Sequence, residues 1–189
     1  MTGIPGVGKT TVLSELQDLA RQNKLNLTVL NYGTLMNEIM RDLGKELHRD
    51  KMRQQSIETQ RKVQELAAAE IANRAGPGIA VVDTHMFIRT ASGMWAGLPQ
   101  NVLERLEPRL LVLVEADPEQ IANRRRGDTE RMREQALAEE IAFDLEWSRA
   151  TAAASAVVTG SPVKVIRNDA GKQKQAAQEL FDAIRQLTE

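Results

Sequence analysis

Apolar residues follow two different spacings along the chain, and the two spacings alternate. Short apolar runs occupy 27–30, 79–82, 110–115 and 163–166, and they predict strands. Between them, apolar residues recur every three or four positions, which predicts helices over 9–23, 34–43, 56–75, 99–107, 117–126 and 134–158, and a last helix containing Ala176, Leu180, Ile184 and Leu187. Residues 84–98 show neither spacing and are expected to form a loop. Alternating strands and helices predict an α/β domain, a parallel sheet flanked by helices.

Composition limits the classes of partner. A chain of 189 residues fits a single domain, here 1–189, with a substantial apolar core. A formal net charge of −1 gives no sign of a nucleic-acid or membrane surface. The sequence contains no cysteine, which excludes disulfides and thiolate metal sites and suits a reducing compartment. We therefore expect a cytoplasmic protein with no nucleic-acid or membrane partner.

The most specific chemical signal is a glycine-rich motif at the beginning of the sequence. The run Gly3-Ile4-Pro5-Gly6-Val7-Gly8-Lys9-Thr10 matches the P-loop pattern GxxxxGK[ST]. In such a turn the backbone N–H groups surround a β-phosphate, and the following helix directs the positive end of its dipole at the same anion. Lys9 would then reach the β- and γ-phosphates, and Thr10 would place its hydroxyl on Mg²⁺. The alternative is a Gly/Pro turn that caps an ordinary helix.

Two acidic residues end apolar strands, where a parallel sheet places ligand-binding groups. Asp83 follows the run 79–82, and its carboxylate is expected to hold Mg²⁺ directly or through a water molecule. Glu115 is the competing candidate. We prefer Asp83 because Asp117-Pro118, directly after Glu115, is typical of a helix start. His85 is expected to support the pocket, since neither histidine of the chain has a metal-ligand spacing.

Arginines crowd a short segment on either side of the helix break at 127–128. They are Arg124, Arg125, Arg126, Arg131 and Arg133. One interpretation is an exposed basic helix face. The other is a lid over 124–134, whose guanidinium groups neutralise the transferred phosphoryl group while the segment closes over the site and excludes water.

In their order along the chain, these segments resemble the archaeal-type adenylate kinases, from Gly3 to the last helix. The resemblance is carried by TGIPGVGKTT (2–11), NYGTLM (31–36), RDKMR (49–53), VVDTH (81–85), GLP (97–99), the arginine turn (124–133), VTG (158–160) and VIRN (165–168). It implies the P-loop nucleoside monophosphate kinase fold, with small nucleoside-monophosphate-binding and lid segments. It also implies Mg²⁺-dependent transfer of a phosphoryl group from ATP to AMP, giving two ADP, and a homotrimer. The alanine-rich helix 134–158 would suit a subunit interface or packing within one chain.

The same resemblance implies roles for individual residues. Residues Gly3 to Thr11 would bind ATP, and a helical region over 33–75 would bind AMP. Gly33, Thr34 and Arg53 would contribute to the AMP side, while Arg124, Arg131 and Arg133 would close over ATP and the transferred phosphoryl group. Other adenylate kinases carry an arginine directly after Gly-x-Pro, but Gln100 stands there in this sequence. We therefore expect Arg53 or Arg89 to face the AMP phosphate.

The position of the P-loop is unusual, because only Met1 and Thr2 precede it. In the family fold the strand before this loop lies in the middle of the sheet, between the strands 79–82 and 110–115. That strand is apparently missing here, and we expect the native chain to carry several more, mostly apolar, residues ahead of Met1. Two other functions remain open at this point. One is a kinase of another nucleoside monophosphate or small molecule, and the other is a nucleotide-binding or ATPase regulatory module with little kinase turnover.

Overall fold

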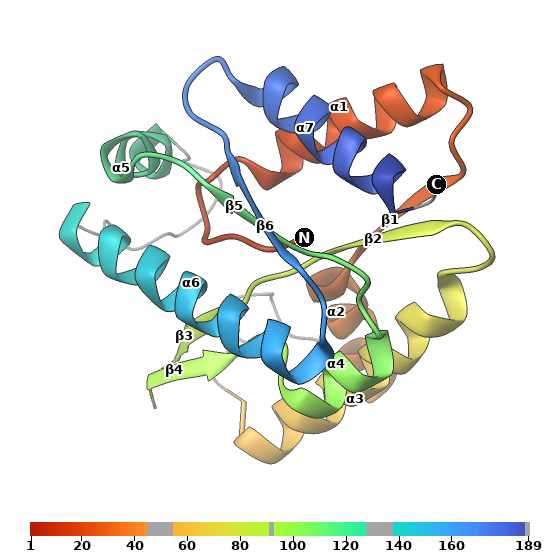
Figure 1. The fold of residues 1–189 in the computed structure, drawn as a ribbon. Coiled ribbons are helices and arrows are strands. Elements are labelled where there is room, and N and C mark those ends of the chain that lie inside the picture. The colour runs from red at the N-terminus through yellow and green to blue at the C-terminus, as the bar shows by residue number, and fades with distance from the viewer. Residues whose placement is uncertain (45–54, 91–92, 128–137, 188–189) are drawn as a thin grey trace.

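The computed structural model describes residues 1–44, 55–90, 93–127 and 138–187, and Figure 1 shows the elements that these residues form. Helices and strands alternate as the apolar spacing predicts. The helices are α1 (Lys9–Gln22), α2 (Tyr32–Asp42), α3 (Ile57–Arg74), α4 (Gln100–Leu106), α5 (Pro118–Gly127), α6 (Ala138–Thr159) and α7 (Gln173–Gln186). The strands are β1 (Leu27–Asn31), β2 (Ile79–Asp83), β3 (Phe87–Thr90), β4 (Gly93–Ala96), β5 (Leu111–Glu115) and β6 (Val163–Arg167).

The parallel strands form two ladders, and the first two residues of the chain lie between them. Strand β1 pairs with β2, and β5 pairs with β6, both in parallel. The Met1 nitrogen donates to Val82 O at 2.8 Å on one side, and the Thr2 nitrogen donates to Val112 O at 2.7 Å on the other. Residues 1 and 2 thus occupy the place between β2 and β5 where we expected the strand before the P-loop. That position is confirmed.

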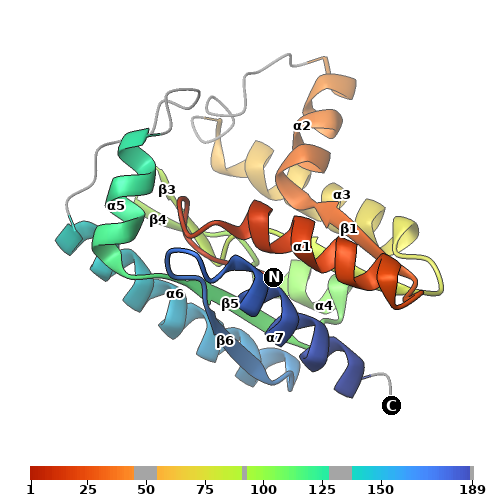
Figure 2. The ribbon, with the colours of Figure 1, turned by 90° about the horizontal axis from the view of Figure 1, so that it is seen from above.

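Helices cover both faces of these ladders (Figures 1 and 2). Helices α1 and α7 pack against each other on one face, and α3, α4 and α6 lie on the other. The apolar spacing that predicts the first helix corresponds to its buried face, since Val12 and Leu16 are fully buried. Strand β5 is buried along its whole length, as its uninterrupted apolar run predicts. The P-loop is therefore positioned by the buried strand β5 and by the buried face of α1.

The expectation of a loop over 84–98 is wrong. Strands β3 and β4 form an antiparallel hairpin there, with Ile88 opposite Trp95. The hairpin is stabilised by contacts with distant elements. The Phe87 ring lies 6.2 Å from the ring of Trp147 on α6, and Trp95 Nε1 donates to Gln64 Oε1 on α3 at 3.4 Å. Such tertiary packing outweighs the weak local strand signal of two four-residue segments.

Within the described ranges, none of the helices combines the length and apolar character that crossing a membrane requires.

Candidate active site

The P-loop adopts a conformation that leaves the start of α1 open. Gly6 and Gly8 have φ values of 93° and 85°, in the left-handed region where glycine is favoured. Gly8 is the N-cap residue of α1, and no side chain caps the helix there. The first N–H groups of α1 are therefore available to an anion, and the helix dipole favours negative charge at this position.

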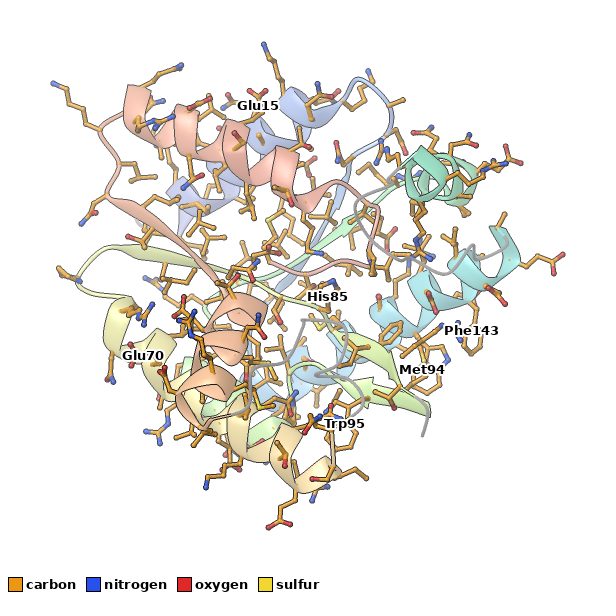
Figure 3. The ribbon with its side chains drawn as sticks, turned by 180° about the vertical axis from the view of Figure 1, so that it is seen from behind. Glu15, Glu70, His85, Met94, Trp95 and Phe143 are labelled. Atoms are coloured by element: carbon orange, nitrogen blue, oxygen red, sulfur yellow. The ribbon has the colours of Figure 1, made fainter. Side chains whose placement is uncertain are left out.

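Lys9 is folded back over this loop. Its Nζ donates to Gly3 O at 2.8 Å and lies 3.5 Å from His85 Nε2, and the residue is buried. His85 lies near the centre of the molecule in Figure 3. Ile4 and Val7 anchor the loop in the core, whereas Thr10 and Thr11 are exposed at the start of α1. The Thr10 hydroxyl is thus open to a ligand.

Asp83 lies at the end of β2, and only one of its two carboxylate oxygens is hydrogen-bonded within the described part of the chain. Its Oδ2 accepts a hydrogen bond from Asn31 Nδ2 at 2.7 Å. Among the described residues, its Oδ1 is one of two buried side-chain polar atoms that have no hydrogen-bond partner. A buried carboxylate oxygen without a donor is costly unless a cation or water satisfies it, so this carboxylate fits a Mg²⁺ ion bound beside the P-loop.

Asn31 joins this carboxylate to the start of α2. Its Oδ1 accepts from the Thr34 backbone nitrogen at 2.9 Å and from Thr34 Oγ1 at 3.0 Å, so Asn31 is the N-cap of α2. The helix consequently begins at Tyr32 rather than at Thr34 as predicted. Gly33 and Thr34, expected on the AMP side, occupy its first turn. Asn31 is the first residue of NYGTLM, but the sequence predicted no role for its side chain.

Glu115 is committed to arginines. Only 1% of the residue is exposed, and its two carboxylate oxygens accept from Arg149 Nε at 2.7 Å and Nη2 at 2.6 Å. Arg167 Nη1 lies 3.8 Å away. These hydrogen bonds raise the pKa of the Arg149 guanidinium above its usual value. A carboxylate so neutralised is a poor metal ligand, which favours Asp83 over Glu115.

The arginines at the end of α5 bind the P-loop itself. Arg124 Nη1 donates to Val7 O at 3.1 Å, and its Nη2 donates to Asn168 O at 2.9 Å. Arg125 Nε donates to Pro5 O at 2.9 Å. The helix that leads into the expected lid is thus attached to the phosphate loop. Arg131, Arg133 and Arg53 lie outside the described residues, as does most of the segment 124–134.

Arg89 lies on β3 and pairs with α6. Its Nη2 donates to Asp144 Oδ1 at 2.6 Å, and its guanidinium carbon is 5.9 Å from the centre of the Phe143 ring. Figure 3 labels Phe143, which lies on α6, and Met94, which lies on β4. The role of Arg89 toward AMP stays a prediction.

A small recess beside α2 and α3 is lined by Met36, Met40, Gln55, Thr59, Gln60 and Val63.

Comparisons with known proteins identify the family of this chain. Residues 2–142 match the family described as an AAA domain. An adenylate kinase of Sulfurisphaera tokodaii is 42% identical over 188 residues, which cover 97% of each chain. Adenylate kinases of Methanopyrus kandleri and Methanocaldococcus jannaschii are 42% and 38% identical, and each alignment covers 98% of this chain and 96% of the relative. The chain belongs to the adenylate kinase family.

Solved structures place this family member among the P-loop kinases by fold. A shikimate kinase from Acinetobacter baumannii, in complex with shikimate, superposes with a TM-score of 0.61 at 20% identity, over 98% of this chain and 90% of that chain. At this identity the likeness concerns the fold alone. As an adenylate kinase family member, the chain is an enzyme of the phosphotransferase class.

Proposed function

We propose that this protein catalyses the reversible transfer of a phosphoryl group from ATP to AMP, giving two ADP. The observation that carries the proposal is the pairing of two features at adjacent strand ends. The P-loop leaves the start of α1 open to phosphate, and Asp83 presents a buried carboxylate oxygen to which no described residue donates a hydrogen bond. Membership of the adenylate kinase family supports the choice of nucleotides.

On the ATP side, Gly3 to Thr11 bind the triphosphate. The N–H groups at the start of α1 surround the β-phosphate, and Lys9 exchanges Gly3 O for phosphate oxygens. Thr10 and Asp83 hold Mg²⁺, Asp83 directly or through a water molecule. A bound Mg²⁺ neutralises the charge that develops on the transferred group. Arg124, Arg131 and Arg133 close over the transferred phosphoryl group from the lid, 124–134, and exclude water.

On the AMP side, Gly33 and Thr34 lie at the start of α2 within the helical region 33–75. The Asn31 side chain caps this helix and also binds Asp83, so the start of the helix is attached to the carboxylate that would hold Mg²⁺. Arg53 or Arg89 faces the AMP phosphate.

The test is ADP formation from ATP and Mg²⁺, with and without AMP. We expect AMP-dependent turnover, and AMP should exceed CMP, UMP, GMP and shikimate as an acceptor. Lys9→Ala should remove most of this turnover and leave the unfolding transition unchanged, while the exposed Lys174→Ala should retain full activity. An equal response to all acceptors would refute the assignment of AMP, and a fully active Lys9→Ala variant would refute the site.

We also propose that the protein assembles as a homotrimer through the outward face of α6. Phe143, Trp147, Val157 and Val158 are exposed along this helix, and Val157 is 87% exposed. Val163 and Val165 of the neighbouring strand β6 are exposed as well. Several exposed apolar side chains on one helix and the neighbouring strand are typical of a subunit interface.

Light scattering during gel filtration tests this assembly. Val157→Asp places a charge on the most exposed of these residues and should yield monomers that keep the native fold. Leu66→Asp changes an exposed apolar residue on α3 and should leave the trimer intact. A monomeric unaltered protein would refute the assembly, and a trimeric Val157→Asp variant would refute the face.

A further inference from the structure

The P-loop is held from behind by three side chains that come from distant parts of the chain. Arg125 Nε donates to Pro5 O at 2.9 Å, and Asn168 Nδ2 donates to Val7 O at 2.7 Å and lies 3.4 Å from Gly8 O. Arg124 adds a second donor to Val7 O and also binds the backbone oxygen of Asn168. Three carbonyl groups of the loop, those of Pro5, Val7 and Gly8, are therefore bound by side chains.

These bonds fix the direction of the opposite N–H groups. In a trans peptide the C=O and N–H bonds point in opposite directions. When Pro5 O is held outward, the Gly6 N–H points inward, and the carbonyls of Val7 and Gly8 fix the N–H groups of Gly8 and Lys9 in the same way. Glycine peptides rotate more easily than others, so a glycine-rich loop without such bonds would lose this orientation.

Asn168 is built into this position. The residue is 2% exposed, and its backbone nitrogen donates to Glu115 O at 2.7 Å. A Cβ atom at Gly8 would lie 2.5 Å from Asn168 Nδ2, and a Cβ atom at Gly6 would lie 3.1 Å from Arg125 Cγ. The two glycines and their two partners therefore fit against each other closely.

We propose that Asn168 and Arg125 are positioning residues of the phosphate site: they hold the P-loop carbonyls outward so that its N–H groups face the phosphates. The proposal rests on the phosphate-binding part of the proposed function. It names two residues that affect nucleotide binding through the loop and do not themselves contact the nucleotide. The preorganised N–H groups bind a triphosphate without a rearrangement of the loop, which raises affinity.

The experiment compares four variants. Asn168→Asp keeps the shape of the side chain and removes its donor. Arg125→Met keeps the stem against Gly6 and removes the donor, whereas Arg125→Lys restores a cationic donor. Arg21→Met is the matched control, because Arg21 is an exposed arginine near the end of α1 and hydrogen bonds to Asp18 of its own helix.

Affinity is measured by calorimetry for MgATP and for inorganic tripolyphosphate, and KM is measured separately for ATP and AMP. Arg125→Met loses one hydrogen bond, so its affinity for both ligands should fall about three- to tenfold. Asn168→Asp should lower the affinity about tenfold or more, because its carboxylate faces two carbonyl oxygens. Both ligands should weaken equally, KM for AMP should stay within about twofold, and Arg125→Lys should recover most of the loss. Arg21→Met should behave as the unaltered protein.

A spectroscopic readout separates positioning from direct contact with phosphate. In the protein without nucleotide, Arg125→Met should shift the NMR resonance of the Gly6 amide, and Asn168→Asp should shift those of Gly8 and Lys9. Unshifted resonances would overturn the proposal, as would an equal rise in both KM values. Weaker ATP binding with unchanged tripolyphosphate binding would assign Asn168 to the base instead and would also overturn it. Tripolyphosphate binding does not need AMP, so a protein that binds it but forms no ADP would refute the proposed reaction alone.

Discussion

The ion pair between Glu115 and Arg149 provides a quantitative test of how this site is supported. The Glu115 side chain is 2% exposed, and the Arg149 side chain, which donates two hydrogen bonds to it, is 53% exposed. Removing one partner of a buried pair costs about 3–5 kcal/mol, because the remaining charge is left without compensation. Here water reaches Arg149 and Arg167 lies 3.8 Å from Glu115, so we expect Arg149→Ala to cost about 2–3 kcal/mol.

The assay is urea and thermal unfolding of the single variants Arg149→Ala and Glu115→Gln and of the double variant. For a domain of this size, about 2–3 kcal/mol corresponds to a decrease in Tm of about 5–10 °C. The double variant should cost less than the sum of the singles by about 1–3 kcal/mol, because the two side chains interact. Arg74→Ala is the matched control, since its pair with Glu70 at 2.6 Å is exposed and an exposed ion pair contributes little to stability.

Two results would refute this reasoning. Additive single variants would show that the pair does not couple, and a loss for Arg149→Ala no larger than that for Arg74→Ala would show that the burial of Glu115 has no energetic consequence. The same variants address the metal. Glu115→Gln should keep its dependence on Mg²⁺, while Asp83→Asn should need a much higher Mg²⁺ concentration; the opposite result would assign the metal to Glu115.

Two further predictions concern the start of α2. Asn31→Ala removes the N-cap and the hydrogen bond to Asp83, so we expect a loss of about 1–2 kcal/mol in unfolding free energy and a higher Mg²⁺ requirement, whereas Asn31→Ser, which can still cap, should recover part of the stability. Burial, and secondarily the charge of Glu65, raise the pKa of Tyr32 well above its usual value of about 10, and its hydroxyl donates to Gln64 O at 2.6 Å. Because Tyr32 is the one tyrosine in the sequence, ultraviolet absorbance should show no tyrosinate at pH 10.5 in the folded protein. The stabilisation by this residue is complete below pH about 10 and is lost as the pH rises toward the folded-state pKa; ionisation near pH 10 without unfolding would contradict the burial.

The sequence predicts the elements that strong local patterns specify. The P-loop with its helix, the parallel strands and the placement of Asp83 at a strand end follow from apolar spacing and one motif. The hairpin Phe87–Ala96 was not predicted, because its strands are short and gain their stability from Trp147 and Gln64, far away in the sequence.

The partners of polar side chains could not be predicted either, because these partners lie far away in the sequence. Arg125 and Asn168 stand 120 and 161 positions away from the P-loop residues that they bind. The segments around both were noted in the sequence, but neither arginine clustering nor the run VIRN indicates a bond to a backbone carbonyl. The guanidinium of Arg124, expected to close over ATP, is bound to Val7 O and Asn168 O in the structure.

The place of residues 1 and 2 between β2 and β5 has a consequence for how the protein folds. The Met1–Val82 and Thr2–Val112 contacts join residues that are 81 and 110 positions apart. Contacts of such long sequence separation carry a loop-closure entropy cost that falls as other elements form, so we expect them to form late in folding. The P-loop, which directly follows these residues, therefore reaches its final conformation only after both strand ladders exist. Phosphate binding should thus be among the last properties to appear during refolding, and bound nucleotide should stabilise the whole chain against unfolding rather than its first segment alone.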